Sequence, residues 1–132
     1  MFSLGDRSLQ RLQGTHPDLI RVVQRAIGLT LVDFTVIQGL RTLAEEQANV
    51  ASGASTTLHS RHLLNKQGFG CAVDLAAWVD SAVAYSPLQL YDQIVLAMKT
   101  AAAAENVPIE AGADWQTFRD YGHFQLPWAT YP

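Results

Sequence analysis

The stretch Cys71-Ala72-Val73-Asp74-Leu75-Ala76-Ala77-Trp78 decides the fold of this chain. An apolar run of this length, rich in residues that pack well, predicts a strand buried at the centre of a sheet. Asp74 interrupts the run, and a carboxylate in such a place is costly unless it is paired or bound to a metal. The alternative is a turn or cap aspartate, which requires the strand to break at Val73. Asp74 is therefore the starting point for the functional interpretation.

Two histidines complete a set of metal-binding residue types. His62 lies in Ser60-Arg61-His62, twelve residues before Asp74, and His123 lies in Asp120-Tyr121-Gly122-His123 near the end of the sequence. Imidazole nitrogen and carboxylate oxygen suit Zn²⁺, and a catalytic zinc site keeps three protein ligands and leaves the fourth position to water. The sequence thus predicts a zinc site formed by His62, Asp74 and His123.

Two neighbouring residues are alternative ligands. His59 lies three residues before His62, a spacing that in a helix would turn both imidazoles toward one ion, but the surrounding residues indicate a loop. We interpret His59 as a bystander, and a shared or substituted ligand role is the alternative. Cys71 lies between Gly70 and Ala72 and fits a small buried apolar residue better than a ligand.

Composition bounds the class of protein. The chain has 132 residues, of which 48% are hydrophobic and 16% charged, and this predicts a single domain over residues 1–132 with one core. The net charge of −3 and the pI near 5.7 argue against a nucleic-acid partner. Cys71 is the only cysteine, which excludes an intrachain disulfide.

The sequence also bears on localisation. Residues 1–7 lack the basic and apolar regions of a signal peptide. No apolar run approaches the roughly 20 residues that span a bilayer, so membrane insertion is not expected. We expect synthesis in the cytosol, and export would need another protein.

Periodicity and turn residues predict a mixture of helices and strands. Thr15 and Ser86 are expected helix caps, and Thr42 with Glu45 has the spacing of a capping box. Residues 51–57 are expected to form a loop and residues 65–70 a turn. Helices are expected over residues 4–12, 15–28, from 42 onward and 87–106, and strands over residues 32–37, 71–78, 107–110 and 121–126.

Arg41 stands where the strand predicted over residues 32–37 gives way to a helix. A guanidinium at the end of a strand is placed to reach a site rather than a core. An ordinary surface arginine is the alternative interpretation.

The order of these motifs resembles that of the M15 zinc peptidases. This family includes D-alanyl-D-alanine dipeptidases and carboxypeptidases, and phage and bacterial L-alanyl-D-glutamate endopeptidases. Residues 15–19 also resemble the opening helix of the phage lysins. The motifs that carry the resemblance are Gly39-Leu40-Arg41-Thr42 with Gln47, Ser60-x-His62, Ala72-Val73-Asp74, and Asp120-x-x-His123 with Phe124 and Leu126.

Two departures from the family pattern stand between the first histidine and the aspartate. Many members have a short Ser-x-His-x-x-Gly-His-Ala-x-Asp stretch, whereas here twelve positions separate His62 from Asp74. Cys71 occupies the position that is usually a histidine. The longer gap is interpreted as a loop insert over residues 65–69 that leaves the ligands intact.

The resemblance implies a fold and a set of roles. The fold would be α+β and hedgehog-like, with a small antiparallel sheet that carries the zinc site and is flanked by helices. The zinc ligands would be His62, Asp74 and His123. Asp120 would be the general base, Arg41 would bind or polarise the substrate, and Ser60 would be a supporting polar contact.

The resemblance also implies a function. We expect a zinc-dependent peptidase that cleaves the L-alanyl-D-glutamate bond of peptidoglycan stem peptides, as a monomeric phage endolysin released to the cell wall through a holin-type pore. One alternative is a D-alanyl-D-alanine dipeptidase or carboxypeptidase. Another is a zinc-containing binding module without turnover, which would have no need of Asp120.

Overall fold

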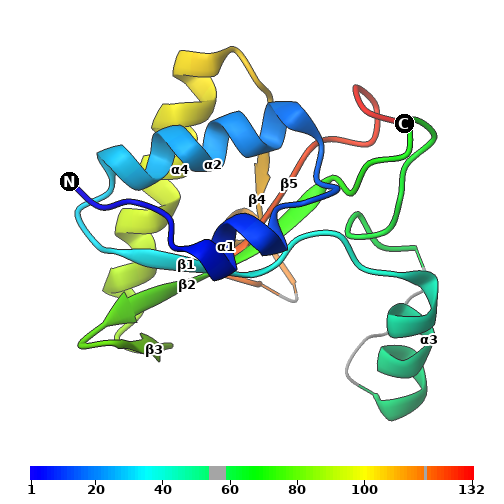
Figure 1. The fold of residues 1–132 in the computed structure, drawn as a ribbon, viewed down its shortest axis with the longest axis horizontal. Helices are drawn as coiled ribbons and strands as arrows, with labels where there is room; N and C mark the ends of the chain where they lie inside the picture. The colour runs from blue at the N-terminus through cyan, green and yellow to red at the C-terminus, as the bar shows by residue number, and fades with distance from the viewer. Residues whose placement is uncertain (54–58, 118) are drawn as a thin grey trace.

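The computed structural model describes residues 1–53, 59–117 and 119–132, and its elements form an α+β fold around an antiparallel sheet (Figure 1). This confirms the predicted fold class. In chain order the elements are α1 (Asp6–Arg11), α2 (Pro17–Leu29), β1 (Phe34–Gln38), α3 (Leu43–Ser52), β2 (Ala72–Val79), β3 (Ala82–Ala84), α4 (Gln89–Glu105), β4 (Glu110–Ala111), the 3₁₀ turn η1 (Gly112–Asp114) and β5 (His123–Gln125).

Strand β2 is the centre of the sheet. The strand order is β1-β2-β5-β4, and β3 pairs with the far end of β2. All pairings are antiparallel, and the β2–β5 register places Val73 opposite Phe124 and Asp74 opposite His123. Because Asp74 lies inside a continuous strand, the turn or cap interpretation of this residue is wrong.

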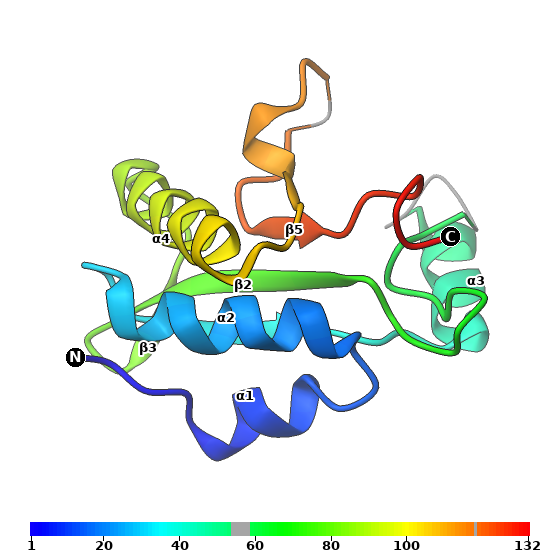
Figure 2. The ribbon, with the colours of Figure 1, turned by 90° about the horizontal axis from the view of Figure 1, so that it is seen from above.

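The core lies between the sheet and a pair of helices. Helices α2 and α4 pack against each other (Figure 2). Their buried side chains join those of β1, β2 and β5 in one hydrophobic cluster. Helix α1 lies along β1, where the Ser8 hydroxyl accepts from the Val36 amide at 3.0 Å and Arg11 donates to the Val36 carbonyl at 2.9 Å. These bonds cover part of an otherwise open strand edge.

Helix α3 projects at one end of the molecule, beside the segment that leads into β2 (Figure 1). The cap predicted at Thr42 is confirmed, because the Thr42 hydroxyl accepts from the Glu45 amide at 3.1 Å. The Thr42 hydroxyl also donates to the Glu45 carboxylate at 3.1 Å, in place of the bond from the Thr42 amide that would complete a capping box. The helix runs to Ser52, so the loop expected over residues 51–57 begins later than predicted. Residues 54–57 of that loop lie outside the described residues.

Two other predicted caps are wrong. Helix α2 is capped by His16, whose Nδ1 accepts from the Asp18 amide at 3.0 Å, while Thr15 forms a bridge with Gly70. Helix α4 begins after Leu88, which makes no side-chain capping bond, so Ser86 is not its cap. In both cases the observed cap lies one or two residues after the polar residue that was expected to cap the helix.

The predictions for the turns and short strands are only partly correct. The turn over residues 65–70 is confirmed, because the Asn65 side-chain oxygen accepts from the amides of Gln67 and Phe69 at 3.0 Å. Strand β4 spans Glu110–Ala111, so only Glu110 of the strand predicted over residues 107–110 is correct, and the 3₁₀ turn η1 follows it. Strand β3 was not predicted. Among the described residues, no helix is both long and apolar enough to cross a lipid bilayer.

Candidate metal centre

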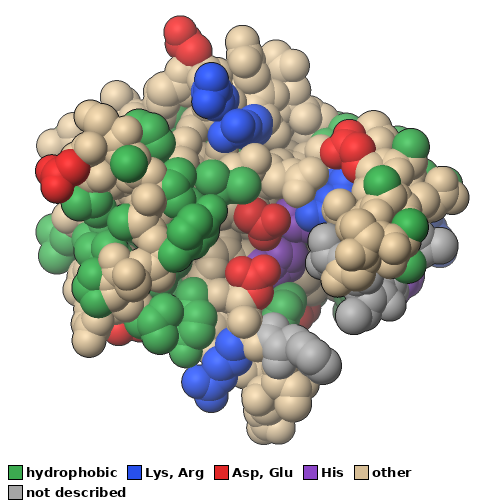
Figure 3. Space-filling model, turned by 90° about the horizontal axis from the view of Figure 1, so that it is seen from below, with side chains coloured by type: hydrophobic (Ala, Val, Ile, Leu, Met, Phe, Trp, Pro, Cys, Tyr) green, Lys and Arg blue, Asp and Glu red, His purple; other side chains and the backbone are tan. Residues whose placement is uncertain are grey.

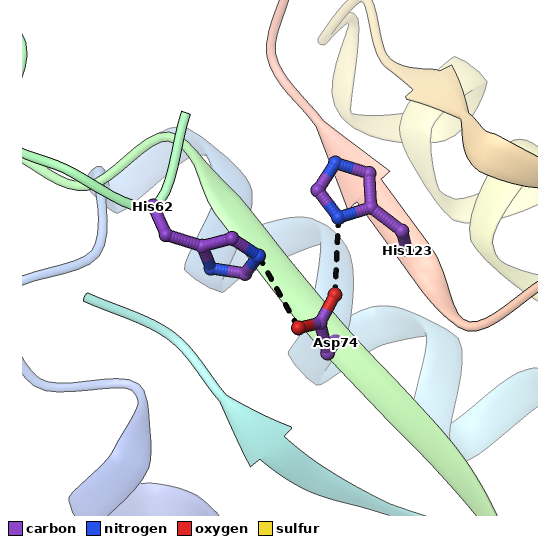
Figure 4. Close-up of side chains that lie close together, drawn as sticks. All are labelled: His62, Asp74 and His123. Atoms are coloured by element: carbon purple, nitrogen blue, oxygen red, sulfur yellow. Dashed lines mark hydrogen bonds and ion pairs between the residues drawn. The ribbon is translucent and has the colours of Figure 1, made fainter. Parts of the chain in front are cut away.

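Asp74, His62 and His123 converge at one point, as Figure 4 shows. Asp74 Oδ1 lies 3.0 Å from His123 Nδ1, and Asp74 Oδ2 lies 3.2 Å from His62 Nε2. One ligand atom from each residue lies within 4.8 Å of the other two. The three residues predicted from the sequence are therefore brought together by the fold.

Asp74 and His123 are placed by the sheet. They stand opposite each other on β2 and β5, and in an antiparallel pair such partners have adjacent side chains. The His123 ring is fixed by a hydrogen bond of 2.8 Å between Nε2 and Gln125 Oε1. Both neighbours of the ring accept hydrogen bonds, so in the metal-free protein a proton on Nδ1 bonds to Asp74, whereas with a metal at Nδ1 the ring would carry its proton on Nε2 and donate to Gln125.

His62 is placed by an irregular segment instead of a strand. Its Nδ1 lies 2.8 Å from the Gly39 carbonyl oxygen, which can only accept, so Nδ1 donates to Gly39 and Nε2 is the nitrogen that faces Asp74. The Ser60 hydroxyl accepts from the His62 amide at 3.1 Å, and the Arg41 amide donates to the His62 carbonyl at 2.8 Å. Ser60 therefore supports the ligand segment, and its predicted role in binding the substrate stays a prediction.

A glycine is required at position 39, whose carbonyl oxygen contacts His62, because Gly39 packs closely against the backbone of Arg11. A Cβ at Gly39 would lie 2.3 Å from the Arg11 carbonyl oxygen, closer than packing allows. Any larger residue would displace the chain that presents its carbonyl to His62.

Contacts among the three residues shift the pKa values of Asp74 and His123. Burial raises the pKa of Asp74, but hydrogen bonds from His123 and His62 outweigh it and hold that pKa well below its usual range. For His123, burial lowers the pKa, and the hydrogen bond and charge of Asp74 outweigh it, so the net pKa lies above the ordinary value. In the metal-free protein a proton thus favours the place between these two residues.

The donor set fits a divalent metal ion. Each imidazole presents one nitrogen to the centre and uses the other to donate to an oxygen, which is the usual arrangement around metal-bound histidines. The side chains of His62 and His123 are buried, whereas that of Asp74 is 26% exposed, so the centre is open on one side. Such a site can hold an ion and still admit a further ligand from solvent.

Asp120 lies next to this open side. It is exposed, and it lines a groove of about 360 Å³ that also contains Asp74. Its charge contributes to the raised pKa of His123. Figure 3 shows acidic and histidine side chains together in a hollow of the surface, with hydrophobic side chains beside them. The position of Asp120 is compatible with the predicted general-base role, which stays a prediction.

Arg41 is not an ordinary surface arginine. Its side chain is 13% exposed, Nη2 donates to Gln38 Oε1 at 2.8 Å, and Nη1 forms an ion pair with the buried carboxylate of Glu46. Its Nε has no hydrogen-bond partner among the described residues. The guanidinium is thus held in one orientation, and its role toward a substrate stays a prediction.

The two alternative ligands lie apart from the centre. The imidazole of His59 stacks on Trp128, with ring centroids 4.1 Å apart and planes 6° from parallel, and it is not part of the described metal-binding group. Cys71 is fully buried in the hydrophobic core, as predicted. Burial raises the pKa of its thiol, which disfavours the thiolate that a metal would need.

Sequence reasoning missed the residues that orient the ligands. Gln125 follows His123 by two positions, and this strand spacing placed both on one face, so periodicity offered a signal. Gly39 acts through its carbonyl, and the pairing of Glu46 with Arg41 depends on how α3 folds back; neither left a recognisable pattern.

An aspartate and a histidine on paired strands, with a second histidine from a neighbouring turn, form a candidate metal site beside an exposed acid, as in a metal-dependent hydrolase. Comparison with known proteins then gives the family: the profile described as phage L-alanyl-D-glutamate peptidase matches residues 1–125. The chain belongs to this family. It is 30% identical over 133 aligned residues to the L-alanyl-D-glutamate peptidase of Escherichia phage T5, covering 98% of this chain and 93% of that protein.

A solved structure agrees. The crystal structure of the Serratia marcescens L-Ala D-Glu endopeptidase ChiX matches with a TM-score of 0.86 and 39% identity, over 96% of this chain and 91% of that one. The resemblance drawn from the sequence motifs is thereby confirmed at the level of the family and the fold.

Proposed function

We propose that this chain is a zinc-dependent peptidoglycan peptidase that cleaves the L-alanyl-D-glutamate bond of stem peptides and serves as an endolysin. The observation that carries the proposal is the convergence of His62, Asp74 and His123 beside a groove that also contains Asp120. Membership of the phage L-alanyl-D-glutamate peptidase family supports the bond that is cleaved. The nitrogen and oxygen donors support zinc over softer metals.

The reaction would be a metal-assisted hydrolysis. When bound, Zn²⁺ would lower the pKa of a water molecule to about 7 and polarise the scissile carbonyl. Asp120 would take the proton of the attacking water and later deliver it to the leaving amine, a role typically worth about 10²–10⁴-fold in rate. Arg41, held by Gln38 and Glu46, would stabilise negative charge on the substrate.

The groove suggests how the substrate lies. Its wall includes Ile37, Tyr85 and Leu88, its charged side chains are Asp74 and Asp120, and no lysine or arginine is among its described residues. Such a lining would repel a free carboxylate and accept an alanine methyl group. We therefore assign the alanyl side of the scissile bond to this groove and the glutamate side to the direction of Arg41.

The remaining expectations also stand as proposals. Residues 1–132 would act as one catalytic domain, because the buried side chains of the described residues form one cluster. The protein would work as a monomer on the cell wall of the host, after synthesis in the cytoplasm and holin-type release. Its partner would be the stem peptide, with no role for nucleic acid.

The test is mass spectrometry of the muropeptides released from purified sacculi, with and without a chelator. We expect new glutamate amino termini that disappear when the metal is removed. Release of alanine with no new glutamate terminus would contradict the endopeptidase and favour a D-alanyl-D-alanine peptidase. Zinc-loaded protein that releases nothing would favour the binding module.

Asp120→Ala separates metal binding from catalysis. Asp120 lies outside the metal-binding group, so this variant is expected to keep one zinc per chain by elemental analysis and to lose about 10²–10⁴-fold in cleavage rate. Undiminished wall lysis by Asp120→Ala would remove this residue from the mechanism.

A further inference from the structure

Arg61 is a buried cation that holds a distant part of the backbone. The residue is 4% exposed, and its guanidinium donates from Nε to the Leu126 carbonyl at 3.0 Å and from Nη2 to the Tyr131 carbonyl at 2.7 Å. Its guanidinium carbon also lies 4.1 Å from the centre of the Trp128 ring. Three contacts thus tie Arg61 to residues 126–131.

These contacts connect the two segments that carry the imidazoles. Arg61 directly precedes His62, and Leu126 directly follows Gln125, the residue that orients His123. The Leu126 amide donates to the Cys71 carbonyl at 2.9 Å, so Leu126 continues the pairing between β5 and the start of β2. The bond from Arg61 to Leu126 is therefore a direct link between the irregular His62 segment and the strand of His123.

The same link is reinforced from the backbone of Arg61. The Cys71 amide donates to the Arg61 carbonyl at 2.7 Å, which fixes the main chain next to His62 against the beginning of β2. With both its carbonyl and its side chain engaged, Arg61 has little freedom to rotate. His62 follows it along a constrained backbone.

The contacts of Arg61 are unusual for a buried charge. No carboxylate of the described residues forms a salt bridge with it, so two carbonyl oxygens and an aromatic face compensate the desolvation of the guanidinium. The N–H groups of the planar guanidinium point in fixed directions, so the two carbonyl oxygens that accept from them are also held in fixed positions. The arrangement favours a positional role over a simple contribution to packing.

From this geometry we infer that Arg61 is a positioning residue, which holds the His62 and His123 segments at the separation that the metal requires before the metal binds. Preorganised ligands bind a metal more tightly, because less order is lost on binding. Residues 126–132, which follow the part matched by the family profile, thereby contribute to metal affinity. The inference rests on the proposed zinc site, not on the identity of the bond that is cleaved.

Arg61→Lys is the sharpest test, because lysine keeps the charge but lacks the fork that reaches two carbonyls at once. Zinc affinity of the metal-free protein is measured by competition with a chromophoric chelator, and stability by urea unfolding of the same preparation. We expect the zinc Kd to rise by about 10-fold for Arg61→Lys and up to about 100-fold for Arg61→Met, the range typical of residues that orient metal ligands.

Arg11→Met is the matched control. Arg11 also donates to a backbone carbonyl, that of Val36 at 2.9 Å, but this bond joins α1 to β1 and, among the described residues, the Arg11 side chain forms no hydrogen bond with either imidazole. We expect Arg11→Met to lower the urea midpoint and to leave the zinc Kd within about twofold of the wild type. A purely structural role for Arg61 would make the two variants behave alike.

A spectroscopic measurement reports on geometry independently of affinity. The visible absorption of Co²⁺ bound in place of zinc depends on coordination geometry, so it should change in Arg61→Lys and stay unchanged in Arg11→Met. A zinc Kd and a Co²⁺ spectrum like those of the wild type in Arg61→Lys would overturn the inference. Wild-type protein that binds no zinc would overturn the metal site itself, whereas zinc binding without cleavage would contradict only the peptidase proposal.

Discussion

The metal centre is built from two regions of different character. Asp74 and His123 lie on paired strands, where the register of β2 and β5 sets their separation. His62 lies on a turn, where individual hydrogen bonds to Gly39 and Ser60 set its orientation. The centre therefore combines a ligand pair fixed by a sheet with a third ligand fixed by a loop.

This difference shows how each region can fail. A one-residue slip between β2 and β5 would turn one ligand of the pair to the other face of the sheet, and the core residues Val73 and Phe124 prevent it, because they would become exposed. The His62 segment has no such protection from register. It depends on a few bonds that single substitutions can remove.

Removing a ligand is the largest expected effect. In His62→Ala and His123→Ala the metal loses one of three protein donors, so we expect loss of both zinc and cleavage, measured by elemental analysis and release of muropeptides. The loss should be equal in the two variants, although one residue lies on a loop and the other on a strand. A fully metallated and active variant would show that the ligand set is wrong.

Substitution of the residues that orient the ligands should change the zinc Kd by different amounts in the strand region and in the loop region. In Gln125→Leu the His123 ring loses its only hydrogen bond outside the centre among the described residues, and we expect a rise of about 10- to 100-fold in the zinc Kd. In Ser60→Ala the Gly39 carbonyl still holds the His62 ring, so the rise should be smaller. Competition with a chelator measures both, and a larger effect from Ser60→Ala would reverse the order of importance.

The pH dependence of the metal-free protein is the smallest expected effect. The pKa of His123 is raised, so its contribution to the free energy of unfolding is complete below the ordinary value of 6.5 and is lost as the pH rises through the folded-state pKa. The pKa of Asp74 is lowered, so its contribution is present above 3.8 and is lost as the pH falls toward the folded-state value. With chelator present, this pair should stabilise most between these two values.

Urea unfolding between pH 5 and 8 checks this expectation, with His123→Gln as the control that cannot titrate. The wild type should lose stability relative to the control as the pH rises above about 6.5. With zinc present the trend should reverse, because the metal binds neutral imidazole and competes with protons. A wild-type profile parallel to that of His123→Gln in the chelated state would contradict the proton-sharing arrangement of Asp74 and His123.

The sequence predicted the parts of this protein that depend on local patterns. The strand around Asp74, the strand of His123 and the cap at Thr42 are confirmed, because runs of apolar residues and side-chain capping act within a few residues. The caps expected at Thr15 and Ser86 are wrong, since a polar residue near a helix start competes with its neighbours for the cap. Strand β3 is too short to leave a pattern.

By itself, the sequence determined which residue types were available to a metal and, through the order of its motifs, the family to which the chain belongs. Only the tertiary structure decided that His62 is oriented by Gly39 and that Arg61 joins the segments of His62 and His123. The physical reason is that these contacts join residues 23 and 65 positions apart, or act through backbone carbonyls that every residue possesses. The residue type at a position therefore does not reveal such a partner before the chain has folded.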